Sequence, residues 1–228
     1  MSAGEREGVV KYAAAHRSDP LSPQATAASP ALLASRAALL RLGFLGSDPA
    51  RYEGLGYGNV SCRLPPYGAP RRARSFLVTG SQTAHLAEPS LALLAEVEAY
   101  DLGAGRICSR GAVAPSSEAL SHAAFYDVGI HVRWVIHAHS PELWRAAADA
   151  LLGRGVVWAE GAYGSQTLAQ EIGRQWRQST LSERGWLAMA GHQDGVMSFG
   201  RSAQEALTRL LEAWQVAVAA LMVKSWRR

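Results

Sequence analysis

The chain has 228 residues and a hydrophobic fraction of 48%, which is enough for the core of a single α/β domain. Its net charge of +4 is carried almost entirely by arginine, because Lys11 and Lys224 are the only lysines, and this excludes chemistry on a central Schiff-base lysine. The chain has only two cysteines and no signal-peptide core, which predicts a cytoplasmic protein. It has no long apolar run and no basic stripe with interleaved aromatics, so membrane and nucleic-acid partners are not expected.

The first third of the chain predicts an arm followed by a helix. Residues 1–30 combine a short strand candidate at 8–13 with small residues and prolines, so we expect an N-terminal arm or linker ahead of one domain at 31–228. Leucines at helical spacing predict a helix over 31–42, with Ser29 before Pro30 as its cap.

The middle of the chain predicts strands and one helix start. Short alternating strands over 60–64 and 75–79 are typical of a hairpin. A helix or helical turn is expected over 85–94 and a strand over 96–100, and Ser116-Ser117-Glu118 opens a helix with an apolar side. The later expected elements are helices over 141–151, 166–178 and 202–222 and strands over 185–189 and 196–199. Strands that alternate with helices predict an α/β fold with a mixed sheet.

A His-x-His pair lies on the strand that ends at Ser140. Successive side chains of a strand alternate between its faces, so His137 and His139 project from one side. Ser140 followed by Pro141 is typical of a helix start, which places the pair at a strand-to-helix junction. Such a pair can bind a metal ion or can be two ordinary half-buried histidines.

A catalytic metal site of the zinc type needs three protein ligands and an open position. His192, in a glycine-flanked turn after a predicted strand, is the best third ligand. Glu118 is either a helix cap or, near a metal, a general base. The turns at Ser116-Ser117, Thr79-Gly80 and Gly58-Asn59 suit a phosphate group.

Five motifs follow one another in a characteristic order. They are Gly58-Asn59-Val60-Ser61, Thr79-Gly80, Pro115-Ser116-Ser117-Glu118, His137-Ala138-His139-Ser140, and Gly191-His192 with Gly195. Over about residues 31–220 this order resembles the class II aldolase/adducin family, which includes fuculose-1-phosphate aldolase and ribulose-5-phosphate 4-epimerase. The resemblance implies a three-layer α/β/α fold with a central mixed, largely antiparallel sheet.

The resemblance also implies the roles of site residues. A divalent metal, most commonly zinc with manganese, iron(II) or cobalt(II) as alternatives, is expected on His137, His139 and His192, and Glu118 is expected as the acid/base. Phosphate of a small sugar or hydroxy-carbonyl substrate is expected at Asn59, Thr79, Gly80, Ser116 and Ser117. The implied activity is that of an aldolase-type lyase acting through a metal-stabilised enediolate, in a homotetramer whose site lies near a subunit interface. Epimerase, dehydratase and decarboxylase reactions, and a non-catalytic adducin-like domain, are the alternatives.

The sequence departs from the family pattern at two places. The third histidine is usually followed by glycine, but here the sequence is His192-Gln193-Asp194-Gly195, so Asp194 is an alternative ligand or a neighbour of the metal shell. The segment over 152–161 is short, and Trp158 stands where the family has a proton-donating tyrosine. Tyr163 is a candidate substitute.

Overall fold

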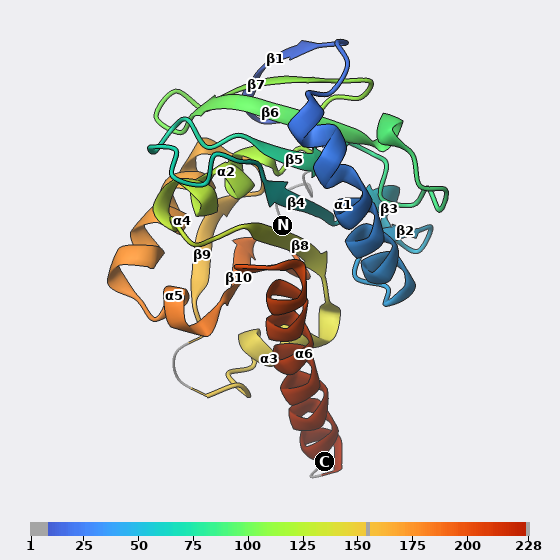
Figure 1. Ribbon diagram of the computed structural model, residues 1–228. Coiled ribbons are helices and arrows are strands. Elements are labelled where there is room, and N and C mark those ends of the chain that lie inside the picture. Colours follow the sequence, from blue (N-terminus) through green and yellow to red (C-terminus); the bar gives the residue numbers. More distant parts are fainter. Residues whose placement is uncertain (1–8, 154–155, 227–228) are drawn as a thin grey trace.

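A nine-stranded sheet crosses the computed structural model, which describes residues 9–153 and 156–226 (Figure 1). Its strands are β1 (Ala13–Arg17), β4 (Asn59–Arg63), β5 (Phe76–Thr79), β6 (Leu94–Asp101), β7 (Arg106–Gly111), β8 (Trp134–His139), β9 (Trp158–Ala162), β10 (Trp186–Gly191) and β11 (Gly195–Gly200). Their order is β1-β7-β6-β5-β4-β8-β11-β10-β9. Only the outer pairs β1/β7 and β9/β10 are parallel, so the predicted mixed, largely antiparallel sheet is confirmed.

Helices cover both faces of this sheet. They are α1 (Pro23–Arg41), α2 (Ala119–Val128), α3 (Pro141–Ala148), α4 (Gln166–Gln178), α5 (Leu181–Arg184) and α6 (Ala203–Trp226). One hydrophobic core packs α2 and α4 against the sheet, and a second packs α1, α3 and α6 against the opposite face. The fold therefore has the three α/β/α layers that the sequence predicts. A small separate sheet joins β2 (Gly46–Asp48) to β3 (Arg51–Tyr57).

The His-x-His strand β8 lies near the middle of the sheet, antiparallel to both β4 and β11. Ile136 and Ala138 enter the core beside α3 and α6, while His137 and His139 point to the other face, as strand alternation predicts. Ser140 accepts a hydrogen bond from the Leu143 N–H and caps α3. The predicted strand-to-helix junction is confirmed.

The predicted arm at 1–30 is wrong where the structure describes it, because β1 belongs to the main sheet and residues 23–30 form the first turns of α1. Helix α1 begins after Ser22, whose Oγ accepts from the Ala25 N–H at 3.2 Å. The alanine-rich stretch favours helix. Pro30 has no N–H to donate to the Thr26 carbonyl, but Ser29 Oγ donates to that carbonyl instead, so the proline is tolerated. The strand candidate at 8–13 lies four or five residues too early.

Of the helix or helical turn predicted over 85–94, the structure forms only the turn. Only a 3-10 turn, η1 (Leu91–Leu93), forms there before β6 begins. Pro89 lacks an N–H and disfavours helical backbone at the residue before it, so the segment cannot continue as an α-helix. Strands β7 and β9 have no counterpart among the predicted elements, because each is short and carries polar or small residues without clear alternation.

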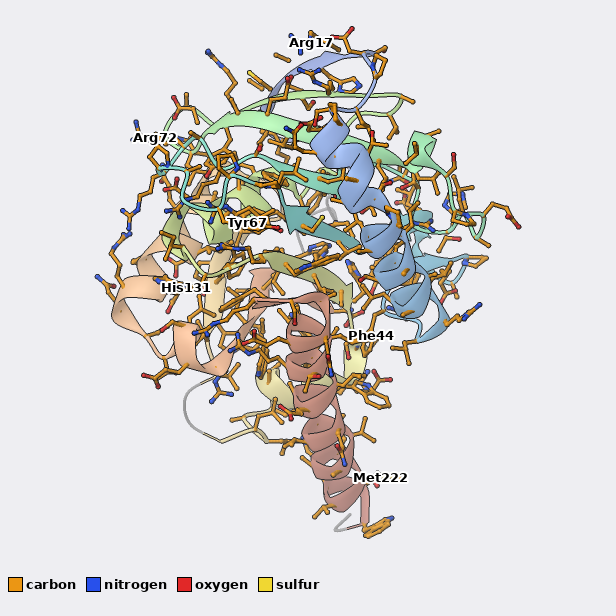
Figure 2. The ribbon with its side chains drawn as sticks, in the orientation of Figure 1. Arg17, Phe44, Tyr67, Arg72, His131 and Met222 are labelled. Carbon is orange, nitrogen blue, oxygen red and sulfur yellow. The ribbon has the colours of Figure 1, made fainter. Side chains whose placement is uncertain are left out.

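Helix α6 extends beyond the body of the molecule (Figure 1), and Met222 lies on its outer half (Figure 2). Val216 is 58% exposed and Trp226 is 81% exposed, although the helix carries no charged residue between Glu212 and Lys224. Of the described helices, α6 is the one long and apolar enough by length and composition to cross a membrane, a test that core helices of soluble proteins also pass.

Candidate metal and acid/base site

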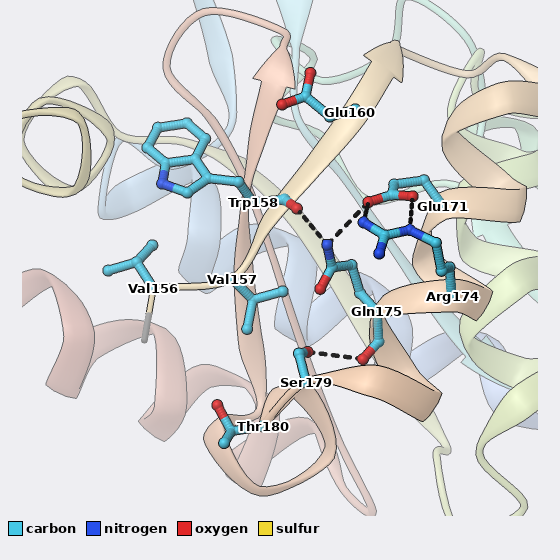
Figure 3. A pocket seen from close by; sticks show the side chains of 9 residues that line it. All are labelled: Val156, Val157, Trp158, Glu160, Glu171, Arg174, Gln175, Ser179 and Thr180. Atoms are coloured by element: carbon cyan, nitrogen blue, oxygen red, sulfur yellow. Dashed lines mark hydrogen bonds and ion pairs between the residues drawn. The ribbon is translucent and has the colours of Figure 1, made fainter. Parts of the chain in front are cut away.

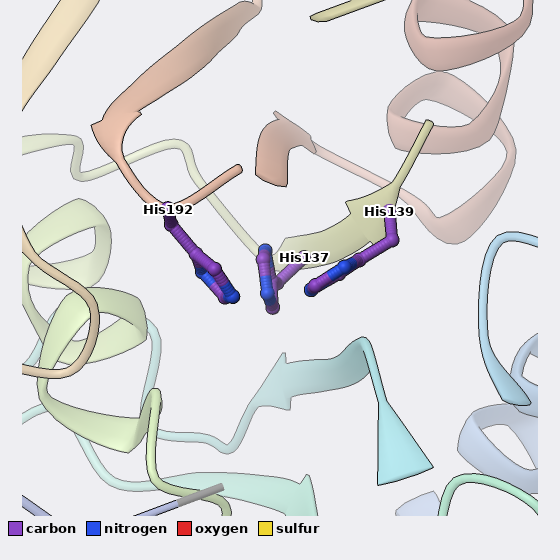
Figure 4. Close-up of side chains that lie close together, drawn as sticks. All are labelled: His137, His139 and His192. Carbon is purple, nitrogen blue, oxygen red and sulfur yellow. The ribbon is translucent and has the colours of Figure 1, made fainter. Parts of the chain in front are cut away.

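Three histidines converge at the C-terminal end of β8 (Figure 4). His137 and His139 come from β8, and His192 comes from the turn after β10. One ligand atom from each lies within 4.8 Å of the others, and none of the three side chains is more than 6% exposed. Sheet pairing of β8 with β11 brings the distant His192 to the pair, because β11 begins three residues after it.

His137 and His139 are held in the neutral form that binds metal. Burial lowers the pKa of His137 well below its usual value, and burial followed by positive charge on His192, His137 and Arg51 does the same for His139. The Val196 carbonyl lies 3.2 Å from His137 Nδ1, so this nitrogen carries the proton and Nε2 keeps its lone pair. Buried Nε2 has no hydrogen-bond partner among the described residues. Three converging imidazoles, two of which are held neutral by burial, therefore fit a divalent metal of the zinc type.

Asp194 is not part of the cluster of close ligand atoms. Its carboxylate instead accepts a hydrogen bond of 2.7 Å from the Tyr52 hydroxyl. Tyr52 lies edge-on to His139 with 4.6 Å between ring centroids. Asp194 therefore contacts the Tyr52 side chain, which in turn contacts His139. The geometry favours His192 over Asp194 as the third ligand.

Glu118 lies beside the histidine cluster. It occupies the N-cap position of α2, but its side chain makes no capping hydrogen bond, so the simple cap interpretation does not hold. Its Oε1 is 3.7 Å from His192 Nδ1, and its Oε2 accepts a 2.7 Å hydrogen bond from Ser121 Oγ. The carboxylate is 1% exposed. A buried carboxylate at this distance can exchange a proton with a molecule bound to the histidines.

The three polar turns expected at the site are joined to one another. The Ser116 N–H donates to the Thr79 carbonyl at 3.1 Å, and Gly80 forms a β-bridge with Pro115. Asn59 lies directly opposite His137 in the pairing of β4 with β8. The structure thus places Asn59, Thr79, Gly80, Ser116, Ser117, Glu118, His137, His139 and His192 in one region.

The His122 backbone N–H donates to the Glu118 carbonyl at 3.1 Å, but the His122 imidazole does not hydrogen bond to the Glu118 carboxylate. Its Nδ1 is 2.6 Å from Ser61 Oγ, which is also 2.6 Å from the Tyr126 hydroxyl. Burial lowers the pKa of His122 to about 3, so this imidazole is neutral at physiological pH. His122 therefore packs between α2 and β4, next to Ser61.

Trp158 lies away from the histidines. It lines a pocket of about 500 Å³ between β9 and α4, whose wall includes Arg174 and Gln175 (Figure 3). Gln175 donates to the Trp158 carbonyl, and the indole packs edge-on against Trp144. Within the chain, Trp158 thus packs against Trp144 and α4, and no ring contact joins it to the three histidines among the described residues.

Tyr163 does lie against the histidines, with its ring 4.8 Å from that of His192. The Lys11 ammonium lies 3.7 Å from the centre of the Tyr163 ring, and the Val9 N–H donates to the Tyr163 hydroxyl. Tyr12 donates to the Ser116 carbonyl nearby. The segment before β1, predicted as part of an arm, thus packs beside the site.

The structure adds residues that the motifs did not reveal. Arg51 and Tyr52 reach His139 from the small β2–β3 hairpin, and neither belongs to a recognisable motif. Their signal in the sequence is weak, because a glycine-rich segment such as 54–58 predicts a turn rather than a strand.

Gly164 packs closely against the turn that carries the paired serines. Its φ is +63°, and a Cβ there would lie 2.1 Å from the Ser117 carbonyl oxygen. We expect Gly164→Ala to lower the free energy of unfolding by about 3 kcal/mol, from backbone strain and the clash together. Gly153→Ala is the matched control, because Gly153 also has a positive φ but has open space around it. Its expected loss is about 1 kcal/mol, and equal losses in urea unfolding would contradict the packing argument.

An α/β protein with three convergent imidazoles and a neighbouring carboxylate has the donor set of a divalent metal site. The chain belongs to the class II aldolase and adducin N-terminal domain family, whose model matches residues 50–221. No curated protein sequence matches the chain significantly.

Solved structures share this fold at low sequence identity. YgbL from Klebsiella pneumoniae is 19% identical with a TM-score of 0.62, over 89% of this chain and 92% of that one. A sugar-phosphate aldolase from Thermotoga maritima is 18% identical with a TM-score of 0.63, over 86% and 94%. The L-fuculose-1-phosphate aldolase from Thermus thermophilus is 18% identical with a TM-score of 0.59, over 87% and 95%.

Proposed function

We propose that the protein is a metal-dependent lyase of the class II aldolase type, which cleaves or forms a carbon–carbon bond in a small phosphorylated sugar or hydroxy-carbonyl compound. The observation that carries the proposal is the Glu118 carboxylate, buried 3.7 Å from one imidazole of a three-histidine cluster. Family membership and the sugar-phosphate aldolases among the structural neighbours support the same reaction class.

His137, His139 and His192 are the proposed metal ligands. Three imidazole nitrogen donors favour zinc, with manganese, iron(II) and cobalt(II) as alternatives. A bound divalent metal supplies a Lewis acid that polarises the substrate carbonyl. The Val196 carbonyl orients His137 for this role, because it fixes which ring nitrogen is protonated.

Glu118 is the proposed general acid/base. Its carboxylate would take or return the proton of the substrate carbon or hydroxyl next to the polarised carbonyl. Ser121 holds one carboxylate oxygen, so the other is directed toward His192 and the substrate position. Burial keeps bulk water from competing for that proton.

Phosphate is proposed to bind at Asn59, Thr79, Gly80, Ser116 and Ser117. The Gly80 and Ser116 amides already donate within the fold, to the Leu93 and Thr79 carbonyls. The side chains of Asn59, Ser116 and Ser117 are therefore the proposed donors, and Thr79 and Gly80 shape the turn.

A substrate panel tests the reaction. We expect the zinc-loaded protein to turn over at least one phosphorylated ketose or tetronate and to prefer it to the unphosphorylated compound. Equal rates on both would overturn the phosphate assignment. Epimerised or dehydrated products, in place of cleavage products, would identify one of the alternative reactions of the same site, and a purified protein that takes up no divalent metal would favour the adducin-like alternative.

A homo-oligomer is proposed as the working form, a tetramer by family resemblance with the site near a subunit interface. The exposed apolar side chains of α6 offer a surface that a second copy would cover. Light scattering over a range of concentrations measures this, and a monomer at all of them would contradict it. The cytoplasmic location and the absence of membrane and nucleic-acid partners stay predictions.

A further inference from the structure

We propose that Arg51 is an anion-recognition residue of the active site, which binds a carboxylate or phosphate group of the substrate on the His139 side of the histidine cluster. The inference deepens the proposed function and rests on it. It assigns a negatively charged group to the substrate at a place separate from the paired-serine turn.

The position of Arg51 supports this assignment. The residue begins β3, in the two-stranded β2–β3 sheet that lies apart from the main sheet. Its guanidinium lies 4.9 Å from the centre of the Tyr52 ring and 5.3 Å from that of Tyr57. Both rings also contact His139, with centroid distances of 4.6 and 5.2 Å. The positive charge is therefore one aromatic layer away from a proposed metal ligand.

The guanidinium has hydrogen-bonding capacity that the described fold does not use. Its Nη2 donates to the Tyr52 hydroxyl at 2.7 Å, and Tyr52 in turn donates to Asp194. Its Nε is buried and has no hydrogen-bond partner among the described residues. A planar guanidinium matches a carboxylate or phosphate through two parallel donors, so an anion would satisfy this nitrogen.

The backbone around Arg51 is held in an unfavourable conformation. Tyr52 and Glu53 are consecutive non-glycine residues with φ of 51° and 57°, in the left-handed region. Such backbone is costly and is retained where it positions functional groups. The Tyr52–Asp194 hydrogen bond ties this strained turn to the loop that carries His192, so the hairpin and the metal loop form one unit.

The His192 side and the His139 side of the site carry different ionisable groups. Glu118 places a carboxyl group beside His192, whereas the Arg51 guanidinium lies near His139. A substrate whose hydroxy-carbonyl part lies at the histidines would be orientated by this asymmetry, with its acidic end at Arg51. Hydroxy acids and their phosphate esters are therefore expected to bind better than neutral hydroxy ketones.

Equilibrium binding to the zinc-loaded full chain tests the proposal without turnover. The probes are glycolate, inorganic phosphate and the neutral analogue hydroxyacetone, measured by calorimetry. We expect Arg51→Gln to weaken binding of glycolate, of phosphate or of both by about ten- to hundredfold, since a hydrogen bond to a charged group is lost. Hydroxyacetone binding should change less than about twofold, because no charge is involved. Arg51→Lys should recover part of the loss, since it keeps the charge but not the fork.

Arg41→Gln is the matched control, because Arg41 is exposed at the end of α1 and its loss changes the net charge equally. Loss confined to glycolate identifies a carboxylate as the ligand, and loss confined to phosphate identifies a phosphate. Unchanged binding of both anions in Arg51→Gln, or equal weakening in Arg41→Gln, would overturn the proposal. Zinc affinity is measured in parallel. A wild-type chain that binds no zinc would refute the proposed function, and the anion titrations on the metal-free chain would still decide the role of Arg51.

Discussion

His139→Ala is expected to lose metal binding and turnover together. The side chain supplies one of three converging imidazoles, and two remaining ligands make a much weaker site. Loss of residues that merely support a ligand costs roughly 10–100-fold in metal affinity, so loss of a ligand should cost more than about 100-fold. Competition with a chromophoric chelator measures the zinc dissociation constant directly.

Matched variants separate this effect from a loss of folding. His131→Ala removes an exposed histidine and should leave zinc affinity unchanged. His139→Asn retains a polar side chain in the buried position, so a folded protein that has lost zinc would confirm the ligand role. A zinc affinity equal to that of the wild type in either His139 variant would show that His139 is not a metal ligand.

Glu118→Gln is expected to reduce kcat by about 10²- to 10⁴-fold while zinc still binds. The amide has the shape of the carboxylate and can accept the Ser121 hydrogen bond, but it cannot take up a proton. Turnover of the best substrate from the panel and zinc affinity are measured on the same preparation.

Turnover and zinc affinity together distinguish the loss of proton transfer from the loss of the metal. Glu160→Gln, at an exposed position on β9, is the control for the loss of one negative charge and should retain full activity. Full activity in Glu118→Gln would refute the acid/base role. Loss of zinc in that variant would instead place Glu118 among the groups that hold the metal.

Local sequence was sufficient wherever a short-range rule fixes the structure. The alternation along β8 placed His137 and His139 on one face, and Ser140 before Pro141 marked the start of α3. Helix α4 runs over the predicted 166–178, and Ser165 caps its start. These features depend on hydrogen bonds and side-chain directions within a few residues, so the chain alone encodes them.

Local rules failed where two interpretations were both physically reasonable. Residues 22–30 contain prolines and small residues, which suit a linker, but also alanines and the Ser22-Pro23 start of a helix. Packing of α1 against the main sheet decided in favour of helix. The amino-acid composition of residues 22–30 carries no information about that contact.

The sequence by itself determined the His-x-His strand, the helix starts around it and the candidate residues of the site. Only the tertiary structure decided that His192 rather than Asp194 joins the two histidines, that Glu118 faces His192 instead of capping α2, and that Arg51 stands near His139. The physical reason is distance along the chain. The ring contacts and the carboxylate that surround His137 and His139 come from β3, α2 and the β10–β11 turn, and sheet pairing and core packing bring these segments together.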